Sequence, residues 1–473
     1  MGKLFIGWGH RSITPDKCVN LFGHFAERLT DKVRDPITAT ALVIGSGKEY
    51  AVFVSCDICV VYQEAIKICR KEIKKQIPEI NPENVIFNAT HTHDAPGLAS
   101  WVYPPVPEGA MSPDEYSFFF AGRVTEAVKE AWKNRKPGGV SWGYGQAVVG
   151  HNRRAAYFKN PSGIKGSSGS VVQGTSAMYG RTDIPLFSHI EGYEDHGVDL
   201  LFTFDGEKKL TGTVVNIACT SQETEGLREI SADFWHETRC MLRDKFGRNL
   251  HVLPQCSAAG DLSPHLMYYK KANERMLKLK GISMRDEIAG RITCAVENVL
   301  PHVKKDIKDN LPFSHISKNL KLQRRKITPA ELRIVKKEYD GLMKKKPANH
   351  KDEYVRFIYM RRCRTAMERY EFQKTKPEYP AEVHVVRLGD IAFATNPFEL
   401  YIDYGIQMKA RSPFMQTFIV QLSGGSSGYL PTERGVKGLG YSASVYDNNV
   451  GPEGGQQLVE KTLDMLGKAA KVK

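Results

Sequence analysis

The sequence lacks the features that would place it among membrane or secreted proteins. No apolar run reaches the length of a membrane span, although 41% of the 473 residues are apolar. The segment Met1–Trp8 has no signal-peptide apolar region, and Ile6 stands where the myristoylation motif after Gly2 requires Ser or Thr. The nine cysteines are scattered without disulfide-framework spacing, which is typical of a reducing compartment. We therefore expect a cytoplasmic protein with no integral membrane segment.

The sequence also lacks the signs of nucleic-acid binding. Its 67 Lys and Arg exceed its 53 Asp and Glu, which gives a net charge of +14. Much of the excess lies in stretches with helical periodicity, such as Lys344–Lys346, and no basic stripe is interleaved with aromatic residues. We expect a solvated charged face and a small-molecule substrate, with an anionic substrate or surface as the weaker alternative. The oligomeric state is left open.

Segments with strand and helix periodicity interleave along the chain. Because no internal repeat or clear linker interrupts them, we expect one α/β (α+β) domain over residues 1–473, with mixed β-sheets flanked by helices. Strands or hairpins are predicted over residues 4–14, 40–61, 85–87, 140–149, 198–219, 250–256, 382–395 and 418–422. Helices are predicted over residues 63–76, 114–134, 232–246, 285–300, 354–372, 399–411 and 455–468, with a further helix opened by the capping box at Thr328–Glu331.

One long segment, at about 150–197, does not follow this alternation. It is rich in Gly, Ser, Pro and polar residues, as in Gly166–Ser170, and contains His151, Arg153 and His196. Long irregular insertions inside compact domains are usually functional or disordered. We expect this segment to be an active-site loop.

The stretch Asn88–Gly97 contains the clearest candidate site. It follows the apolar run Val85–Phe87, which reads as a buried strand. On a strand, residues two apart point to one face, so His91 and His93 are expected to lie side by side at the strand's end. Two imidazoles there make half of a metal site, with one buried and one surface histidine as the plain alternative.

Three other stretches of polar residues follow predicted strands in the same way, namely Ser257–Pro264, Asn396–Glu399 and Gly424–Thr432. Loops at strand ends are where α/β proteins build their sites. Cys56 and Cys59 form a lone C-x-x-C inside an apolar run, for which we predict buried structural thiols.

The motifs in these stretches, and their order along the chain, resemble the signature of the neutral/alkaline non-lysosomal ceramidase family. The beginning of the chain, Ile6–Gly9 and Ile13–Pro15, and the later Asp35–Ala39 are similar too. The resemblance covers essentially the whole chain as the catalytic domain, and the C-terminal immunoglobulin-like domain of secreted members is expected to be absent. The motifs are Asn88–His93 with Pro96-Gly97, Gly260–Pro264, Pro397–Glu399 and Gly428–Thr432.

The resemblance implies a zinc amidase with a ceramidase-like fold. By residue type, His91, Glu399 and Tyr429 match the family's zinc ligands, His93 is their close neighbour, and Ser263 matches a serine proposed to act in catalysis. Zinc with an open position lowers the pKa of a bound water and polarises a carbonyl. Ser263 and Arg153 are expected to stabilise developing oxyanion charge, and Asp261 is a further catalytic candidate.

The chain departs from the family pattern at one ligand. The family has another zinc-binding histidine after a strand, typically in Asn-x-Ala-x-His-Pro, and here Thr220 takes its place after Asn216. Cys219 would point to the opposite face, which leaves His189, His196 or His236 as possible replacements from elsewhere. Without a replacement the oxygen-rich set favours weaker zinc binding, another metal or no metal.

Other interpretations stay open for each candidate. Glu399 could cap the helix that it begins, Ser263 could lie in a turn, Tyr429 could belong to the core, and Asp57 could be a hydrogen-bonded strand-end residue. We favour metal-dependent hydrolysis of an amide or ester bond in a small, lipid-like or glycosylated substrate. One alternative is a metal-independent glycoside hydrolase with a carboxylate pair from Asp57, Asp261 and Glu399. Another is a non-catalytic binding protein on the same fold.

Overall fold

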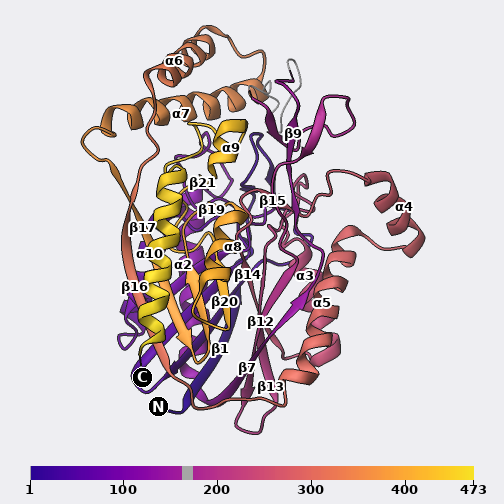
Figure 1. The fold of residues 1–473 in the computed structure, drawn as a ribbon, viewed down its shortest axis with the longest axis vertical. Helices are drawn as coiled ribbons and strands as arrows, with labels where there is room; N and C mark the ends of the chain where they lie inside the picture. Colours follow the sequence, from indigo (N-terminus) through magenta and orange to yellow (C-terminus); the bar gives the residue numbers. More distant parts are fainter. Residues whose placement is uncertain (1, 162–173, 473) are drawn as a thin grey trace.

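A large mixed sheet forms the centre of the protein (Figure 1). The computed structural model describes residues 2–161 and 174–472, so the predicted Gly166–Ser170 stretch lies outside the described residues. The neighbours β5–β6 and β13–β14 are parallel, and the other neighbours are antiparallel. In spatial order the strands are β14 (His251–Cys256), β13 (Leu210–Ile217), β12 (Gly197–Asp205), β7 (Lys136–Gln146), β1 (Leu4–Ser12), β4 (Thr38–Ser46), β5 (Glu49–Cys56) and β6 (Val85–Ala89).

A second, smaller sheet packs face to face against the first. Buried aromatic side chains fill the layer between them: the rings of Phe53, in the large sheet, and Phe393, in the smaller one, are 4.9 Å apart, and Phe393 also lies 4.4 Å from Phe418 of its own sheet. Apolar contact of this kind is the main stabilising contribution between packed layers. The strands of the second sheet are β16 (Phe313–Gln323), β17 (Glu378–Leu388), β18 (Ile391–Thr395) and β20 (Gln416–Val420), with β18 and β20 parallel.

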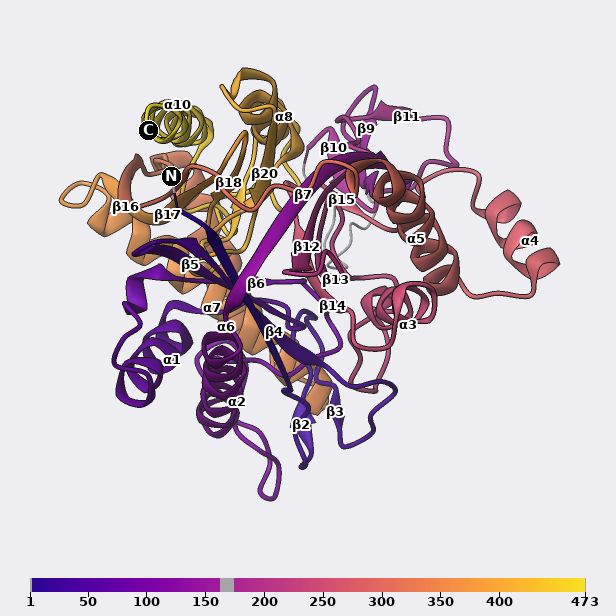
Figure 2. The same cartoon turned by 90° about the horizontal axis from the view of Figure 1, so that it is seen from below.

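Helices cover the two outer faces, so that the layers run helices, sheet, sheet, helices (Figure 2). The outer face of the large sheet carries α1 (Gln63–Gln76), α2 (Pro113–Lys133), α3 (Phe234–Phe246) and α5 (Met284–Val303). The outer face of the smaller sheet carries α8 (Ile402–Arg411) and α10 (Pro452–Ala470).

Glycines on β1 allow α2 to lie unusually close to the large sheet. A Cβ atom added at Gly7 would stand 2.0 Å from the Ala131 carbonyl oxygen, so a side chain at this position would force the helix away. The preceding and following residues of β1, Ile6 and Trp8, point instead into the apolar layer between the sheets.

The helical hairpin of α6 (Pro329–Lys344) and α7 (His350–Phe372) lies at one end of the molecule, at the top of Figure 1. The predicted capping box is confirmed: Thr328 Oγ1 accepts from the Glu331 N–H, and the Glu331 carboxylate accepts from Thr328 N–H. The helix α4 (Lys270–Lys280), the short α9 (Glu433–Gly438) and the 3-10 turn η1 (Pro82–Asn84) complete the helical segments of the described chain.

The segment at 150–197 contains more regular structure than the irregular loop that we predicted. Within its described residues it forms short strands, because the backbone groups of this buried segment find partners in ladders. The short strands of the protein are β2 (Val19–Asn20), β3 (Leu29–Thr30), β8 (His151–Asn152), β9 (Arg154–Tyr157), β10 (Ser176–Met178), β11 (Phe187–Ile190), β15 (Leu262–Ser263), β19 (Glu399–Leu400) and β21 (Tyr429–Leu430).

The predicted fold class, mixed sheets flanked by helices, is confirmed. The prediction of a strand beginning at Val140 was wrong, because β7 already begins at Lys136 and runs through Gly138 and Gly139. In the described part of the chain, no helix combines the length and the apolar character that crossing a membrane requires.

Candidate active site

The candidate residues lie on loops that follow the carboxyl ends of parallel strand pairs. The loops after β5 and β6 carry Cys59 and His91, and those after β18 and β20 lead to Glu399 and Tyr429. Parallel neighbours end at one edge of a sheet, so their loops emerge together. A backbone hydrogen bond joins these edges of the two sheets: the Ala89 N–H donates to the Leu422 carbonyl over 3.4 Å.

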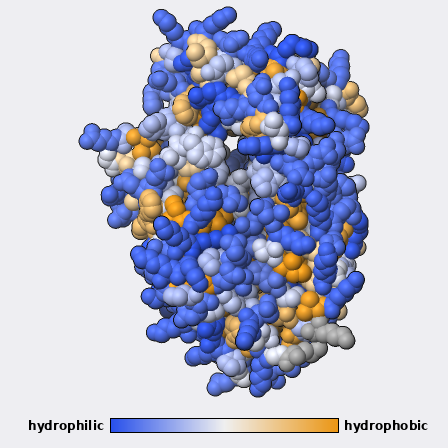
Figure 3. All heavy atoms as spheres, turned by 90° about the vertical axis from the view of Figure 1, so that its left-hand side faces the viewer, coloured by the Kyte–Doolittle hydropathy of each residue, from blue (hydrophilic) through white to orange (hydrophobic). Residues whose placement is uncertain are grey.

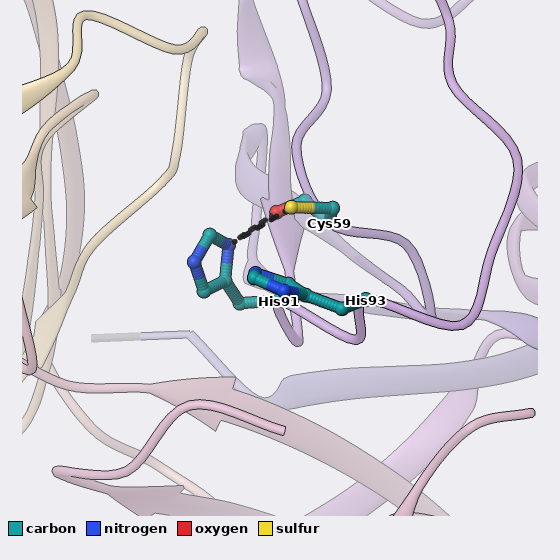
Figure 4. A group of neighbouring side chains, drawn as sticks. All are labelled: Cys59, His91 and His93. Carbon is teal, nitrogen blue, oxygen red and sulfur yellow. Dashed lines mark hydrogen bonds between the residues drawn. The ribbon is translucent and has the colours of Figure 1, made fainter. Parts of the chain in front are cut away.

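His91 and His93 lie side by side, but strand alternation is not the cause. The strand β6 ends at Ala89, and His91 has a left-handed backbone with φ of 68°. The two rings meet edge to face with centroids 5.1 Å apart (Figure 4). The loop is held by the buried ion pair of Arg28 Nη1 with Asp94 Oδ1 at 3.0 Å and by the His91 N–H, which donates to Ile58 O.

The tautomer of His91 follows from one hydrogen bond. Nδ1 lies 2.7 Å from the carbonyl oxygen of Cys59, which can only accept, so Nδ1 carries the proton (Figure 4). Nε2 lies on the opposite side of the ring, 3.4 Å from Glu399 Oε2; burial is outweighed by Cys59 and Glu399, which raise the pKa of His91, so a metal would take the place of the proton on Nε2. A backbone carbonyl that fixes one nitrogen and frees the other is the usual support for a metal-ligating histidine.

Glu399 and Tyr429 are paired across the short strands β19 and β21, where their Cα atoms are partners in register. Glu399 Oε2 is buried and has no hydrogen-bond partner within the described residues. Burial opposes ionisation of Glu399, but His91 and Tyr429 outweigh it and lower the pKa of this carboxyl group. The N-cap residue of α8 is Tyr401, so the alternative of Glu399 as a helix cap was wrong.

His93 is engaged by two residues that follow β13. Glu225 Oε2 lies 3.3 Å from Nδ1 of His93, and the Gln222 amide nitrogen lies 2.7 Å from Nε2. The Gln222 amide oxygen accepts from the Thr220 hydroxyl at 2.6 Å and from Arg153 Nη1 at 3.1 Å, which fixes the orientation of the amide. The Nε2 lone pair of His93 is therefore already occupied by Gln222.

Thr220, which the resemblance aligns with the missing family histidine, is hydrogen-bonded to Gln222. Thr220 and Gln222 are both buried. None of the proposed replacements lines the cavities at the site: Cys219 packs into the core under α3, His189 is exposed, His196 pairs with Glu194, and His236 lies near Cys240 on α3. The described residues therefore offer no histidine replacement at Nε2 of His91.

Two cavities meet at these residues. One, of about 280 Å³, is lined by Cys59, His91, Glu399 and residues of α7. The other, of about 360 Å³, is lined by Arg153, Gln222 and Glu225. His93 and Tyr429 line both. The face in Figure 3 is mainly hydrophilic and is hollowed near the end where α6 and α7 lie.

The remaining predicted residues lie behind the cavities. The carboxylate of Asp261 accepts from Asn152 Nδ2 and from the Ile402 N–H, each over 2.8 Å. Asp57 makes a two-pronged ion pair with Arg239 over 2.8 and 2.9 Å. Ser263 is fully buried in β15 and reaches the site only through Tyr179, whose hydroxyl accepts from Arg153.

Sequence reasoning missed four residues of the site: Cys59, Gln222, Glu225 and His24. Cys59 Sγ lies 3.5 Å from His91 Nδ1, and burial of this thiol is outweighed by His91 and His93, which lower its pKa to about 6. The sequence signal for Cys59, Gln222 and Glu225 was their position just past a strand, the same criterion that selected His91. His24 gave no comparable signal.

The donor set fits a divalent metal between His91 and Glu399. The evidence is Nε2 of His91 facing a buried carboxylate oxygen that lacks a partner, with the Tyr429 ring beside it. Two further groups with metal-ligand spacing share His93: Cys59, His91 and His93, and also His24, His93 and Glu225. Nδ1 of His91 is hydrogen-bonded to the Cys59 carbonyl, and Nε2 of His93 is hydrogen-bonded to Gln222. We therefore favour a metal site between His91 and Glu399 over the two groups that contain His93.

Comparison with known proteins agrees with this architecture. Residues 5–173 match the family model described as neutral/alkaline non-lysosomal ceramidase, N-terminal. The neutral ceramidase of Pseudomonas aeruginosa has a TM-score of 0.70 at 15% identity, with 100% of this chain and 75% of that chain covered. A second ceramidase structure, complexed with C2, gives a TM-score of 0.68 at 15% identity over 100% and 76%. No curated protein sequence matches the chain. The predicted resemblance is confirmed by the family model over residues 5–173, and the two structures show that the whole chain has a ceramidase-like fold.

Proposed function

We propose that this protein hydrolyses an amide or ester bond with the help of a divalent metal held by His91, Glu399 and Tyr429. The observation that supports this most strongly is the orientation of the His91 ring: Nδ1 is held by the Cys59 carbonyl, so that Nε2 faces Glu399 Oε2, which has no hydrogen-bond partner among the described residues. A metal bound there would supply Lewis-acid polarisation of the scissile carbonyl. The set is rich in oxygen, so the metal is zinc in a weakened site or a harder cation.

The chain's own residues supply the polar surroundings of the reacting group. Arg153 and Tyr429 line one cavity and can donate hydrogen bonds to oxyanion charge that develops on the substrate. Glu225 and Gln222 hold the His93 ring edge-on to His91. Burial is outweighed by Cys59 and Glu225, which raise the pKa of His93, and because Nε2 accepts from Gln222 the proton of His93 lies on Nδ1, toward Glu225.

The cavity sizes bear on the substrate. Volumes of about 280 and 360 Å³ suit a small acyl compound or one end of a lipid-like or glycosylated one. The family name indicates ceramide, but three arginines line the first cavity, which is a polar environment for a long hydrocarbon chain. We propose a more polar amide or ester as the substrate.

Elemental analysis of the purified protein tests the proposal. We expect about one metal ion per chain in the wild type. The variant His91→Ala should lose the metal and the hydrolysis of 4-nitrophenyl esters and N-acyl amides. His189→Ala is the matched control, because His189 is exposed and lines neither cavity at the site. A wild type that stays metal-free after incubation with Zn²⁺, Mn²⁺ and Mg²⁺ would refute the metal mechanism.

The glycoside hydrolase alternative receives less support from the geometry. Of the three carboxylates proposed for it, only Glu399 lines a cavity at the site, whereas Asp57 and Asp261 are held by Arg239, Asn152 and the Ile402 N–H. A chelator separates the two, because a carboxylate pair would continue to cleave glycosides in its presence.

A further inference from the structure

One guanidinium in the wall of the first cavity has no partner. Arg361, on α7, lines the cavity that also contains His91 and Glu399. It makes no hydrogen bond or ion pair with any residue that the structure describes, and its Nε is buried. Arg361 is half-buried, so its charge lies at the edge of the cavity without a counter-ion among the described residues and is available to a charged ligand.

The neighbouring arginines show what a structural role looks like on this helix. Arg362 forms an ion pair with Asp447 over 2.5 Å, and its guanidinium lies over the Tyr441 and Tyr446 rings. Arg369 donates to the Val445 carbonyl over 2.6 Å and also to the carbonyl of Asn448. Arg362 and Arg369 therefore hold α7 against the loop after α9, whereas Arg361 forms no ion pair with any described residue.

Aromatic rings surround Arg361 on the cavity side. Its guanidinium carbon lies 5.4 Å from the centre of the Trp101 ring, and Trp101 meets Tyr62 edge to face at 5.3 Å. Trp101 is 53% exposed, so this part of the cavity is close to solvent. Tyr62, Arg361 and the candidate metal ligand Glu399 all line this cavity.

We propose that Arg361 binds an oxyanion of the substrate, a carboxylate or a phosphate, while the scissile bond lies at His91 and Glu399. This inference rests on the proposed function of the same cavity and narrows its substrate class to anionic amides or esters. A guanidinium presents a planar fork that matches both oxyanions, and its cation–π contact with Trp101 holds the plane without consuming a donor. The two other arginines of the wall already have partners, Arg362 in Asp447 and Arg369 in the carbonyl of Val445.

Binding of small probes to the whole protein tests this without requiring turnover. Isothermal calorimetry would compare glutarate, methyl phosphate and the neutral analogue glutaramide. We expect one anion to bind more tightly than glutaramide, and Arg361→Gln to weaken that anion by about tenfold to a hundredfold, the usual range for a charged hydrogen bond. Tighter binding of glutarate would indicate a carboxylate on the substrate, and tighter binding of methyl phosphate would indicate a phosphate.

Arg364→Gln is the matched control, because Arg364 is exposed on the same helix and does not line the cavity. It should bind the anion like the wild type. Without ligand, Arg361→Gln should melt at or above the wild-type temperature, since it removes a half-buried charge that has no counter-ion among the described residues. Equal binding of the anion by Arg361→Gln and Arg364→Gln, or no preference of the wild type for either anion, overturns the proposal. A clear fall in melting temperature for Arg361→Gln does so too, because it would show a structural role. Anion binding that depends on Arg361 in a protein without hydrolytic activity would refute only the proposed function.

Discussion

Replacing Gln222 tests whether its amide organises the site. Its side chain bridges four groups, of which all but Glu225 are buried: the Thr220 hydroxyl at 2.6 Å, Arg153 Nη1 at 3.1 Å, His93 Nε2 at 2.7 Å and Glu225 Oε2 at 3.2 Å. A buried hydrogen bond contributes about 1 kcal/mol, or more when a partner is charged, and water from the adjoining cavity can replace part of the loss. We expect Gln222→Ala to lower the free energy of unfolding by about 3 kcal/mol.

For a chain of 473 residues this corresponds to a fall in melting temperature of about 3 °C, measurable by differential scanning calorimetry. Ser221→Ala is the control, because Ser221 is equally buried, adjacent in sequence, and its hydroxyl has no hydrogen-bond partner among the described residues. Its melting temperature should stay within about 1 °C of the wild type. If Gln222→Ala melts like Ser221→Ala, the amide does not hold the site together and the reasoning is refuted.

Two further predictions concern buried carboxylates. Burial, followed by Asp233 and Glu225, raises the pKa of Glu223 from 4.5 to about 8 in the folded protein. Between pH 4.5 and about pH 8 the folded protein keeps a proton on Glu223 that the unfolded chain has lost, so the free energy of unfolding falls with rising pH by up to about 1.4 kcal/mol per pH unit. Glu223→Gln should remove this pH dependence when urea unfolding is compared at pH 5 and pH 8. An unchanged pH dependence would contradict the raised pKa of Glu223. Glu191 accepts from Arg154 Nε and Nη2 over 2.8 and 3.0 Å in the core. Glu191→Ala should therefore lower the free energy of unfolding by about 3 kcal/mol, measured by the same calorimetry. The control Glu433→Gln, at an exposed ion pair with Lys437, should change the free energy of unfolding little.

Local patterns were enough to predict most of the elements. The strand–turn–strand hairpin at Asp205–Glu207 and the helix over 63–76 were predicted within a few residues, because periodicity and turn residues are encoded nearby in the chain. The prediction that site residues follow strand ends also agrees with the placement of His91, Glu399 and Tyr429 around one cavity.

The rest depends on contacts between distant segments. Cys59 has the sequence surroundings of a buried structural thiol, and only the pairing of β5 with β6 brings it to His91. Asp261 and Asp57 have the chemistry of catalytic acids, but their partners Asn152 and Arg239 lie more than 100 positions away in the chain. Whether a carboxylate serves catalysis or packing is decided by such partners, which periodicity does not reveal.

The face-to-face packing of the two sheets has a consequence for the order of folding. His91 follows the large sheet and Glu399 follows the smaller one, 308 positions apart, and Gln63 of α1 donates to the carbonyl of Gly424 across 361 positions. Contacts of such long range form slowly, because closing a large loop costs conformational entropy before any contact stabilises it. An intermediate with either sheet alone would therefore contain native strands and hairpins but no catalytic geometry. The docking of one sheet on the other is the step that creates the site.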